Sequence, residues 1–198
     1  MGLAKPKGDM DGLSDEALMV RIAEGDAAAY ECLVGRHLNR AVALANRIVR
    51  NRAEAEELAQ EAFLRVWTTA PRWRPDGAAF RTWFSRVLVN LCIDRCRRPG
   101  FAPLEAAGDP ADEAPGAEQN VAASEEAAAL NRAMEALPPN QRAALAMCYW
   151  ENMSNQDAAT ALSVSVGAVE SLLVRARRAL RAALEPHLGR PAVDRRRT

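Results

Sequence analysis

The sequence predicts an all-α protein of two small helical domains joined by a flexible acidic linker. Alternating runs of β-branched residues are nearly absent, so strands are not expected. Apolar residues recur at helical spacing on either side of the middle of the chain. Between them, residues 99–124 are rich in Pro, Ala, Gly and acidic residues, a composition that buries too little apolar surface to fold.

The charges are segregated along the chain, although 26 Lys and Arg residues balance 26 Asp and Glu residues. Residues 100–131 contain acids and no Lys or Arg, whereas the chain from Arg175 onward is rich in Arg. The zero net charge therefore hides an acidic middle and a basic end suited to nucleic acid. Hydrophobic residues make up 49% of the chain, and many are Ala, which predicts small cores between helices.

Residues 13–98 form the first predicted domain, after a polar tail over residues 1–12 that is expected to be disordered. Ser14 caps a helix that ends at Gly25, and a longer helix covers residues 26–50. A third begins near Ala53 and stops before Pro71, because proline breaks a helix. The segment 71–77, PRWRPDG, is predicted to be a loop, and a fourth helix covers residues 79–97.

Residues 125–185 form the second predicted domain, followed by a basic tail over residues 186–198. Helices resume near Glu125, pause at the Pro138-Pro139 pair and continue over residues 140–151. Ser154, with Asp157 three residues later, is typical of a capping box at the start of a short helix. Ser165 is expected to cap a second helix after a tight turn. This arrangement is a helix-turn-helix, which places its second helix in the major groove of DNA.

The second helix of this motif has two faces. Its apolar residues are expected to pack inward, which leaves the opposite face free to meet DNA. A solvated surface helix is the alternative, and the capped helix and turn before it favour the DNA-binding interpretation. Glu170 either accepts a hydrogen bond from a cytosine amino group or pairs with Arg175 or Arg178. The exposed face carries Gly167, Glu170, Ser171, Val174, Arg175 and Arg178.

Aromatic and basic residues also alternate around the predicted loop of the first domain. Such a cluster suits single-stranded nucleic acid, because bases stack on rings while cations follow the phosphates. Phe84 and Trp83 are expected to belong to the core, and Trp73 is expected to be exposed. The cluster comprises Trp73, Phe80, Trp83, Phe84, Arg72, Arg74, Arg81 and Arg86.

No catalytic, cofactor or metal site is predicted. The chain has only His37 and His187, no Gly-rich phosphate loop and no CxxC, so an enzyme is disfavoured. Cys92 and Cys96 lie one helical turn apart and either join His37 in a metal site or are small buried apolar residues, which we favour. No apolar run is long enough to span a membrane and no signal peptide is visible, so a cytoplasmic protein with reduced thiols is expected.

Three stretches in order resemble bacterial RNA polymerase sigma factors of the extracytoplasmic-function group of the sigma-70 family. AEAEELAQEAFLRVW, residues 53–67, resembles the segment of region two that docks on the polymerase clamp helices. FRTWFSRVLVNLCIDRCRR, residues 80–98, resembles the helix that recognises the promoter −10 element. The run from Leu137 to Leu180 resembles region four, which reads the −35 element and contacts the polymerase flap.

The resemblance implies a dissociable, non-catalytic subunit that directs transcription initiation, responds to stress and is held by an anti-sigma factor, without membrane insertion. Residues 13–98 would be the region-two helical bundle and residues 125–185 the region-four helix-turn-helix domain. The implied polymerase contacts are Glu57, Leu58, Gln60, Glu61, Leu64 and Arg65. The implied −10 contacts are Trp73, Arg74, Asp76, Arg81, Trp83, Arg86, Asn90, Arg97 and Arg98. The implied −35 contacts are Gly167, Glu170, Ser171, Val174, Arg175, Arg177 and Arg178.

The recognition helix departs from the pattern of these factors. Members commonly carry Thr-Val-Lys-Ser-Arg where this chain has Ala168-Val169-Glu170-Ser171-Leu172, so the family's −35 sequence preference does not transfer. The alternative function is a conventional helix-turn-helix regulator with an N-terminal sensor or partner-binding domain. It leaves the Arg/Trp cluster and the Glu-Gln-Glu docking face unexplained.

Overall fold

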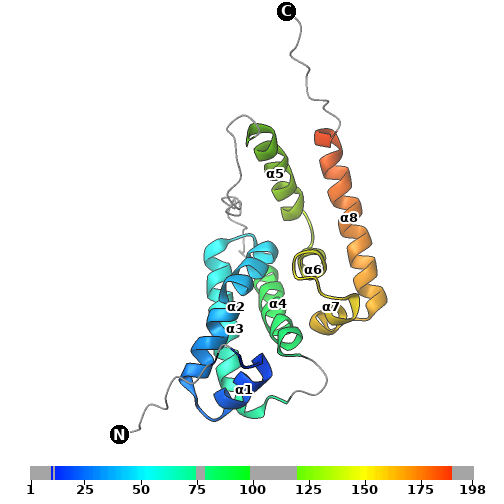
Figure 1. Ribbon diagram of the computed structural model, residues 1–198. Helices are drawn as coiled ribbons and strands as arrows, with labels where there is room; N and C mark the ends of the chain where they lie inside the picture. Colours follow the sequence, from blue (N-terminus) through cyan, green and yellow to red (C-terminus); the bar gives the residue numbers. More distant parts are fainter. Residues whose placement is uncertain (1–9, 11, 75–78, 99–119, 189–198) are drawn as a thin grey trace, which may run out of the picture.

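The computed structural model describes residues 10, 12–74, 79–98 and 120–188, and every element in these ranges is helical (Figure 1). The first group consists of α1 (Asp15–Ala23), α2 (Ala27–Val49), α3 (Arg52–Thr69), the 3₁₀ turn η1 (Ala70–Arg72) and α4 (Phe80–Arg97). The second consists of α5 (Asn120–Glu135), α6 (Pro139–Leu145), the π-helical turn η2 (Ala146–Trp150), α7 (Asn155–Leu162) and α8 (Val166–Leu188). The predicted all-α fold with two helical domains is confirmed.

One predicted boundary is wrong. Helix α5 begins at Asn120, inside the stretch 99–124 that was expected to be linker, because residues 121–130 are rich in Ala and Glu, both strong helix formers. The rest of that stretch, residues 99–119, lies outside the described residues, as do nearly all of the predicted N-terminal tail and residues 189–198 of the C-terminal tail.

Short polar side chains start the helices of the first group. Ser14 Oγ accepts a hydrogen bond from the Ala17 N–H at 3.2 Å, as the sequence predicts. The Asp26 carboxylate does the same for the first turn of α2, and Asn51 Oδ1 for the first turn of α3. Each cap satisfies N–H groups that have no partner within the helix, so the local sequence fixes where α1, α2 and α3 begin.

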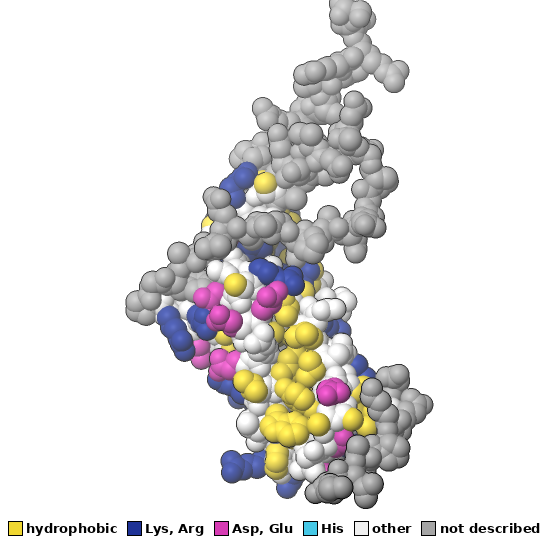
Figure 2. All heavy atoms as spheres, turned by 90° about the vertical axis from the view of Figure 1, so that its left-hand side faces the viewer, with side chains coloured by type: hydrophobic (Ala, Val, Ile, Leu, Met, Phe, Trp, Pro, Cys, Tyr) yellow, Lys and Arg dark blue, Asp and Glu magenta, His cyan; other side chains and the backbone are white. Residues whose placement is uncertain are grey.

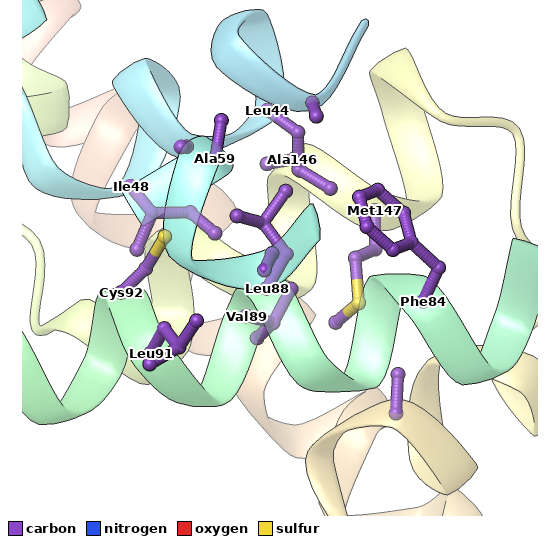
Figure 3. Packing of buried hydrophobic residues seen from close by; sticks show 14 of the residues in the cluster. Leu44, Ile48, Ala59, Phe84, Leu88, Val89, Leu91, Cys92, Ala146 and Met147 are labelled. Atoms are coloured by element: carbon purple, nitrogen blue, oxygen red, sulfur yellow. The ribbon is translucent and has the colours of Figure 1, made fainter. Parts of the chain in front are cut away.

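The two groups share one hydrophobic core. Helices α6 and α7 lie against α4, and α5 lies beside α8 (Figure 1). Figure 3 shows Leu44 of α2 near Ala146 of η2, and Ile48 of α2 beside Cys92 of α4, in a cluster that also contains Leu88 and Met147. Half of the buried residues that α6 and η2 contribute are Ala, whose small side chains let these helices approach α2 and α4 closely.

Arg142 of α6 contacts the C-terminal ends of α2, α4 and α5. Its side chain is buried, with the residue only 4% exposed, yet every nitrogen of the guanidinium has a partner. Nε donates to the Ile48 carbonyl in the last turn of α2 at 2.7 Å. Nη1 donates to the carbonyl of Glu135, the last residue of α5, at 2.9 Å, and to the carbonyl of Leu137, just beyond it, at 2.7 Å. A cation at a helix C-terminus satisfies unpaired carbonyls and opposes the negative end of the helix dipole.

Burial lowers the pKa of the Arg142 guanidinium, and the neighbouring Cys96 opposes that shift. The ordinary pKa of arginine is so high that the group stays charged. It is therefore a buried cation whose desolvation is offset by several carbonyl oxygens rather than by one carboxylate.

We expect Arg142→Met to lower the free energy of unfolding by about 3 kcal/mol, because the methionine leaves buried carbonyls of α2 and α5 without a donor. Urea unfolding followed by circular dichroism measures this loss. Arg132→Met, at an exposed position on α5, is the matched control and should change stability by no more than about 0.5 kcal/mol. Equal stability of the two variants would contradict the capping role of Arg142.

Candidate nucleic-acid interface

Helices α7 and α8 form the predicted helix-turn-helix. Ser154 Oγ accepts from the Asp157 N–H at 3.0 Å and donates to the Asp157 carboxylate at 2.7 Å, which fixes the start of α7. Ser163 adopts the left-handed conformation, with φ of 56°, and ends that helix. Ser165 Oγ accepts from the Ala168 N–H at 3.2 Å at the start of α8. The chain bends by 99° between the two helices, as this motif requires.

Helix α8 has the two faces that the sequence predicts. Val169, Leu173 and Ala176 are buried against the rest of the second group. Arg177 lies partly along its own helix, since Nε donates to the Leu173 carbonyl at 3.3 Å. A shallow groove on α8 is lined by Val174, Arg177, Arg178 and Arg181. The residues implied for −35 contact are all exposed: Gly167, Glu170, Ser171, Val174, Arg175, Arg177 and Arg178.

Glu170 makes no ion pair with Arg175 or Arg178 in the part of the chain that the structure describes, although pairing was one of its two predicted roles. Its carboxylate is exposed on the face that carries these arginines. The second role, acceptance of a hydrogen bond from a cytosine amino group, stays a prediction.

A stripe of α3 presents most of the implied polymerase contacts. Glu57, Gln60, Glu61, Leu64 and Arg65 recur at the three- and four-residue spacing that places side chains on one side of a helix. Leu64 is 62% exposed, an unusual position for a large apolar side chain. The Arg65 guanidinium pairs with the Glu61 carboxylate at 2.7 Å beside it. The stripe therefore combines an exposed apolar side chain, Leu64, with a neighbouring ion pair between Glu61 and Arg65.

Leu58 does not belong to this stripe. It is 2% exposed and packs in the core with Ala55, Ala62 and Phe63, so its prediction as a surface contact is wrong. Position 58 falls on the inward stripe of α3, directly after Glu57 on the outward stripe. Conversely, Trp67 follows Leu64 by three residues and is 39% exposed, yet it was not predicted as a contact.

Trp67 packs edge-on against Tyr30 of α2, with ring centroids 5.2 Å apart. Figure 2 shows apolar side chains gathered on the face of α2 and α3, with acidic and basic side chains along its edge. The signal that would have found Trp67 is the spacing from Leu64, since both lie on the outward side of the same helix. This face carries an apolar surface with no partner among the described residues.

The implied −10 contacts on α4 separate into two sets. Trp83, Arg86, Asn90 and Arg97 share one stripe, and Arg86 and Arg97 are exposed along it. Arg81 lies on the opposite side of the helix, where its guanidinium meets Glu151 of the second group. Arg98 is exposed at the end of α4, and Asp76 lies outside the described residues.

The predicted exposure of Trp73 is wrong. The backbone N–H of Trp73 donates to the carbonyls of Thr69 and Ala70, and this turn carries the ring inward until only 8% of the residue is exposed. Its ring lies 6.4 Å from that of Trp83, which is partly exposed. Arg74, beside it, is exposed and donates to the Trp73 carbonyl at 3.1 Å. Trp73 thus supports Trp83 rather than offering its own face to a base. The predicted burial of Phe84 is confirmed.

The cysteines behave as the favoured interpretation predicts. Cys92 is fully buried, and burial raises the pKa of its thiol. Burial also raises the pKa of Cys96, whose sulfur lies 3.9 Å from the Ile48 carbonyl oxygen. His37 instead pairs with Asp15 at 2.7 Å. In the described residues no cluster of three metal-binding side chains occurs, and Cys92, Cys96 and His37 are not gathered into one.

None of the helices in the described ranges is by itself long and apolar enough to cross a membrane; α7 and α8, bent against each other, meet that criterion only as a pair.

Comparison with known proteins identifies both halves of the chain. Residues 33–100 match Sigma-70 region 2, and residues 127–180 match Sigma-70, region 4. The ECF RNA polymerase sigma factor SigE of Mycolicibacterium smegmatis is 36% identical over 83% of this chain and 66% of its own length. The RNA polymerase sigma-H factor of Pseudomonas aeruginosa is 31% identical over 88% of this chain and 95% of its own.

A solved structure is also similar. CnrH, determined in complex with the cytosolic domain of CnrY, superposes with a TM-score of 0.64 at 28% identity, over 87% of this chain and 97% of CnrH.

We expect Trp73→Ala to lower the free energy of unfolding by about 3 kcal/mol or more, the usual cost of truncating a buried tryptophan. Thermal or urea unfolding of the purified protein measures it. Leu64→Ala, which truncates an exposed side chain, serves as the control and should be near neutral, within about 0.5 kcal/mol. A neutral Trp73→Ala would mean that the ring contributes nothing to the core.

Proposed function

Because the chain belongs to the sigma-70 family of RNA polymerase factors, in its extracytoplasmic-function group, we propose that its two helical groups hold one promoter at two points. As a sigma factor it is the subunit that confers promoter specificity on core RNA polymerase. The observation that carries the proposal is the presence, on one chain, of a stripe suited to single-stranded DNA on α4 and a duplex-reading face on α8.

The α8 face reads the −35 duplex. Arg175 and Arg178 are exposed on this face and have no carboxylate partner in the described residues, so both are available to phosphates or base edges. Arg177 lies beside Arg181 in the groove along α8, and its guanidinium contacts the phosphate backbone of the DNA. The distance between the helix and the bases depends on the smaller or uncharged side of this face and on Glu170: the residues are Gly167, Glu170, Ser171 and Val174. The Glu170 carboxylate disfavours bases that offer no hydrogen-bond donor.

The outer stripe of α4 holds the melted −10 strand. Trp83 is partly exposed and offers a ring for stacking, while Arg86, Arg97 and Arg98 follow the phosphates. Asn90 lies between them and provides an amide for a base edge. The Trp73 ring packs against the Trp83 ring, and Arg74 donates to the Trp73 carbonyl.

The α3 stripe binds core polymerase. Leu64 and Trp67 supply apolar area, and Glu57, Gln60, Glu61 and Arg65 surround it with polar groups, the arrangement of a protein interface with an apolar centre and a polar rim. The remaining properties of the family follow as proposals: regulation by an anti-sigma factor in response to stress, a cytoplasmic location, and no catalytic role of its own. Support for a dissociable partner comes from CnrH, which was solved bound to CnrY.

Run-off transcription with purified core polymerase tests the function. We expect the full chain to direct initiation from its promoter above the level of core polymerase alone, and Leu64→Arg to abolish most of it, because a desolvated charge would face the polymerase. Native gels with core polymerase measure the loss of binding directly.

Val20→Arg is the matched control, since Val20 is a similarly exposed apolar residue on α1, away from the stripe. It should initiate normally. Absence of promoter-specific initiation by the unaltered chain would overturn the proposed function, and equal initiation by both Arg variants would overturn only the α3 docking surface.

We expect Arg178→Ala to weaken binding of holoenzyme to −35 duplex by about 1–3 kcal/mol if the guanidinium reads a base edge. Anisotropy titrations of labelled promoter at several salt concentrations measure it. A loss confined to the native −35 sequence identifies a base contact. An equal loss on all duplexes, with a reduced salt dependence, would instead make Arg178 a phosphate contact.

A further inference from the structure

We propose that Arg40 and Arg81 form a phosphate-binding site for the promoter strand, and that Glu151 occupies this site when the two helical groups are packed together. The inference rests on the proposed function, because it concerns how the same factor is kept from DNA. It adds Arg40, on α2, to the residues that meet nucleic acid, and it gives Glu151 the role of an internal competitor.

The contacts around Glu151 carry the proposal. Arg40 Nε donates to the Glu151 carboxylate, and Arg40 Nη2 donates to the Glu151 carbonyl at 3.2 Å. Arg81 Nη2 donates to the same carbonyl and lies 3.7 Å from the carboxylate. Both arginines belong to the first group and Glu151 to the second. One residue therefore presents two kinds of oxygen to two guanidinium groups across the contact between the groups.

The burial is unequal across this cluster. The Glu151 side chain is only 6% exposed, whereas those of Arg40 and Arg81 are 45% and 40% exposed. Arg81 Nε is buried without a hydrogen-bond partner in the described residues. Glu151 lines a small pocket together with His37, Arg40, Arg81 and Ser85. Such a pocket, with two arginine forks around one anion, also matches the oxygens of a phosphodiester.

The local backbone is shaped to deliver Glu151. The preceding turn, η2, is π-helical, and the Glu151 N–H closes it on the Ala146 carbonyl at 3.1 Å. Asn152, next in the chain, has a left-handed φ of 49° and turns the chain away. Single π-helical turns are rare and occur preferentially at functional sites. Here the turn lets the carboxylate and the carbonyl of one residue face α2 and α4 together.

Charge explains why the site changes occupant. In the closed arrangement two cations share one carboxylate, so the cluster keeps a net positive charge. When the groups separate, as they must to reach −10 and −35 elements at once, Arg40 and Arg81 lose that carboxylate and stand side by side. A phosphate then supplies the missing negative charge. Arg81 is the second residue of α4, shortly after the implied −10 contacts Trp73, Arg74 and Asp76, so we assign this phosphate to the −10 strand.

A single-stranded DNA probe tests the competition. We expect Glu151→Gln to bind a fluorescent oligothymidylate about tenfold more tightly than the unaltered full chain, the factor obtained if the closed form makes up about nine-tenths of the free protein. The gain should be the same on an abasic strand, because the contact is to phosphate. Small-angle X-ray scattering should show a larger radius of gyration for the variant.

Two controls make the result specific. Glu24→Gln removes an exposed carboxylate elsewhere on the first group and should leave affinity unchanged. Arg40→Ala combined with Glu151→Gln should lose the gain.

If Glu151→Gln does not fold by circular dichroism, the Arg40→Ala/Arg81→Ala variant replaces it and should bind more weakly than the unaltered chain once an excess of core polymerase has opened the factor.

The proposal is overturned if Glu151→Gln binds no more tightly, if the gain persists without Arg40, or if the gain disappears on the abasic strand. An expanded variant with unchanged affinity would reduce the cluster to a structural clasp and overturn the phosphate site. Run-off transcription by the unaltered chain reports separately on the proposed function, so the two failures are distinguishable.

Discussion

The buried guanidinium of Arg142 is the interaction on which the closed arrangement depends. Carbonyl groups at a helix C-terminus have no partner within the helix and are costly to bury. Helix α2 ends against α6, and the chain after α5 ends there too, so both would bury unpaired carbonyls without a donor at that point. One arginine satisfies them. The contact between the groups is therefore specified by polar geometry, which apolar packing alone does not provide.

This arrangement sorts the functional surfaces into two classes. The α3 stripe, the outer stripe of α4 and the arginine face of α8 stay exposed, so none of them requires the groups to separate. Arg40 and Arg81 are also partly exposed, but their guanidinium groups contact Glu151. A factor packed in this way presents its polymerase-binding surface while part of its strand-binding surface is occupied.

Local signals explain most of what the sequence predicts. Helical periodicity and the caps at Ser14, Ser154 and Ser165 require only residues within one turn, and the structure confirms them. Leu58 and Trp73 were misplaced because their exposure depends on which neighbouring helix covers them, and that is a tertiary property. The Arg40–Glu151 pair joins residues 111 positions apart, and the stretch that the sequence predicts to be a linker lies between them in the chain. Nothing local to Glu151 indicates its partner.

The composition of the contact between the groups decides whether it can open. Its apolar part on α6 and η2 includes Ala143, Ala144 and Ala146, and each Ala buries far less area than a Leu or Phe would at the same position. When the two groups separate, the polar part of the contact exchanges its protein hydrogen bonds for hydrogen bonds to water or DNA, at a modest net cost in free energy. The polar contacts therefore specify the geometry of the interface. A Leu-rich interface would lock the two groups together, and the protein could not span a promoter.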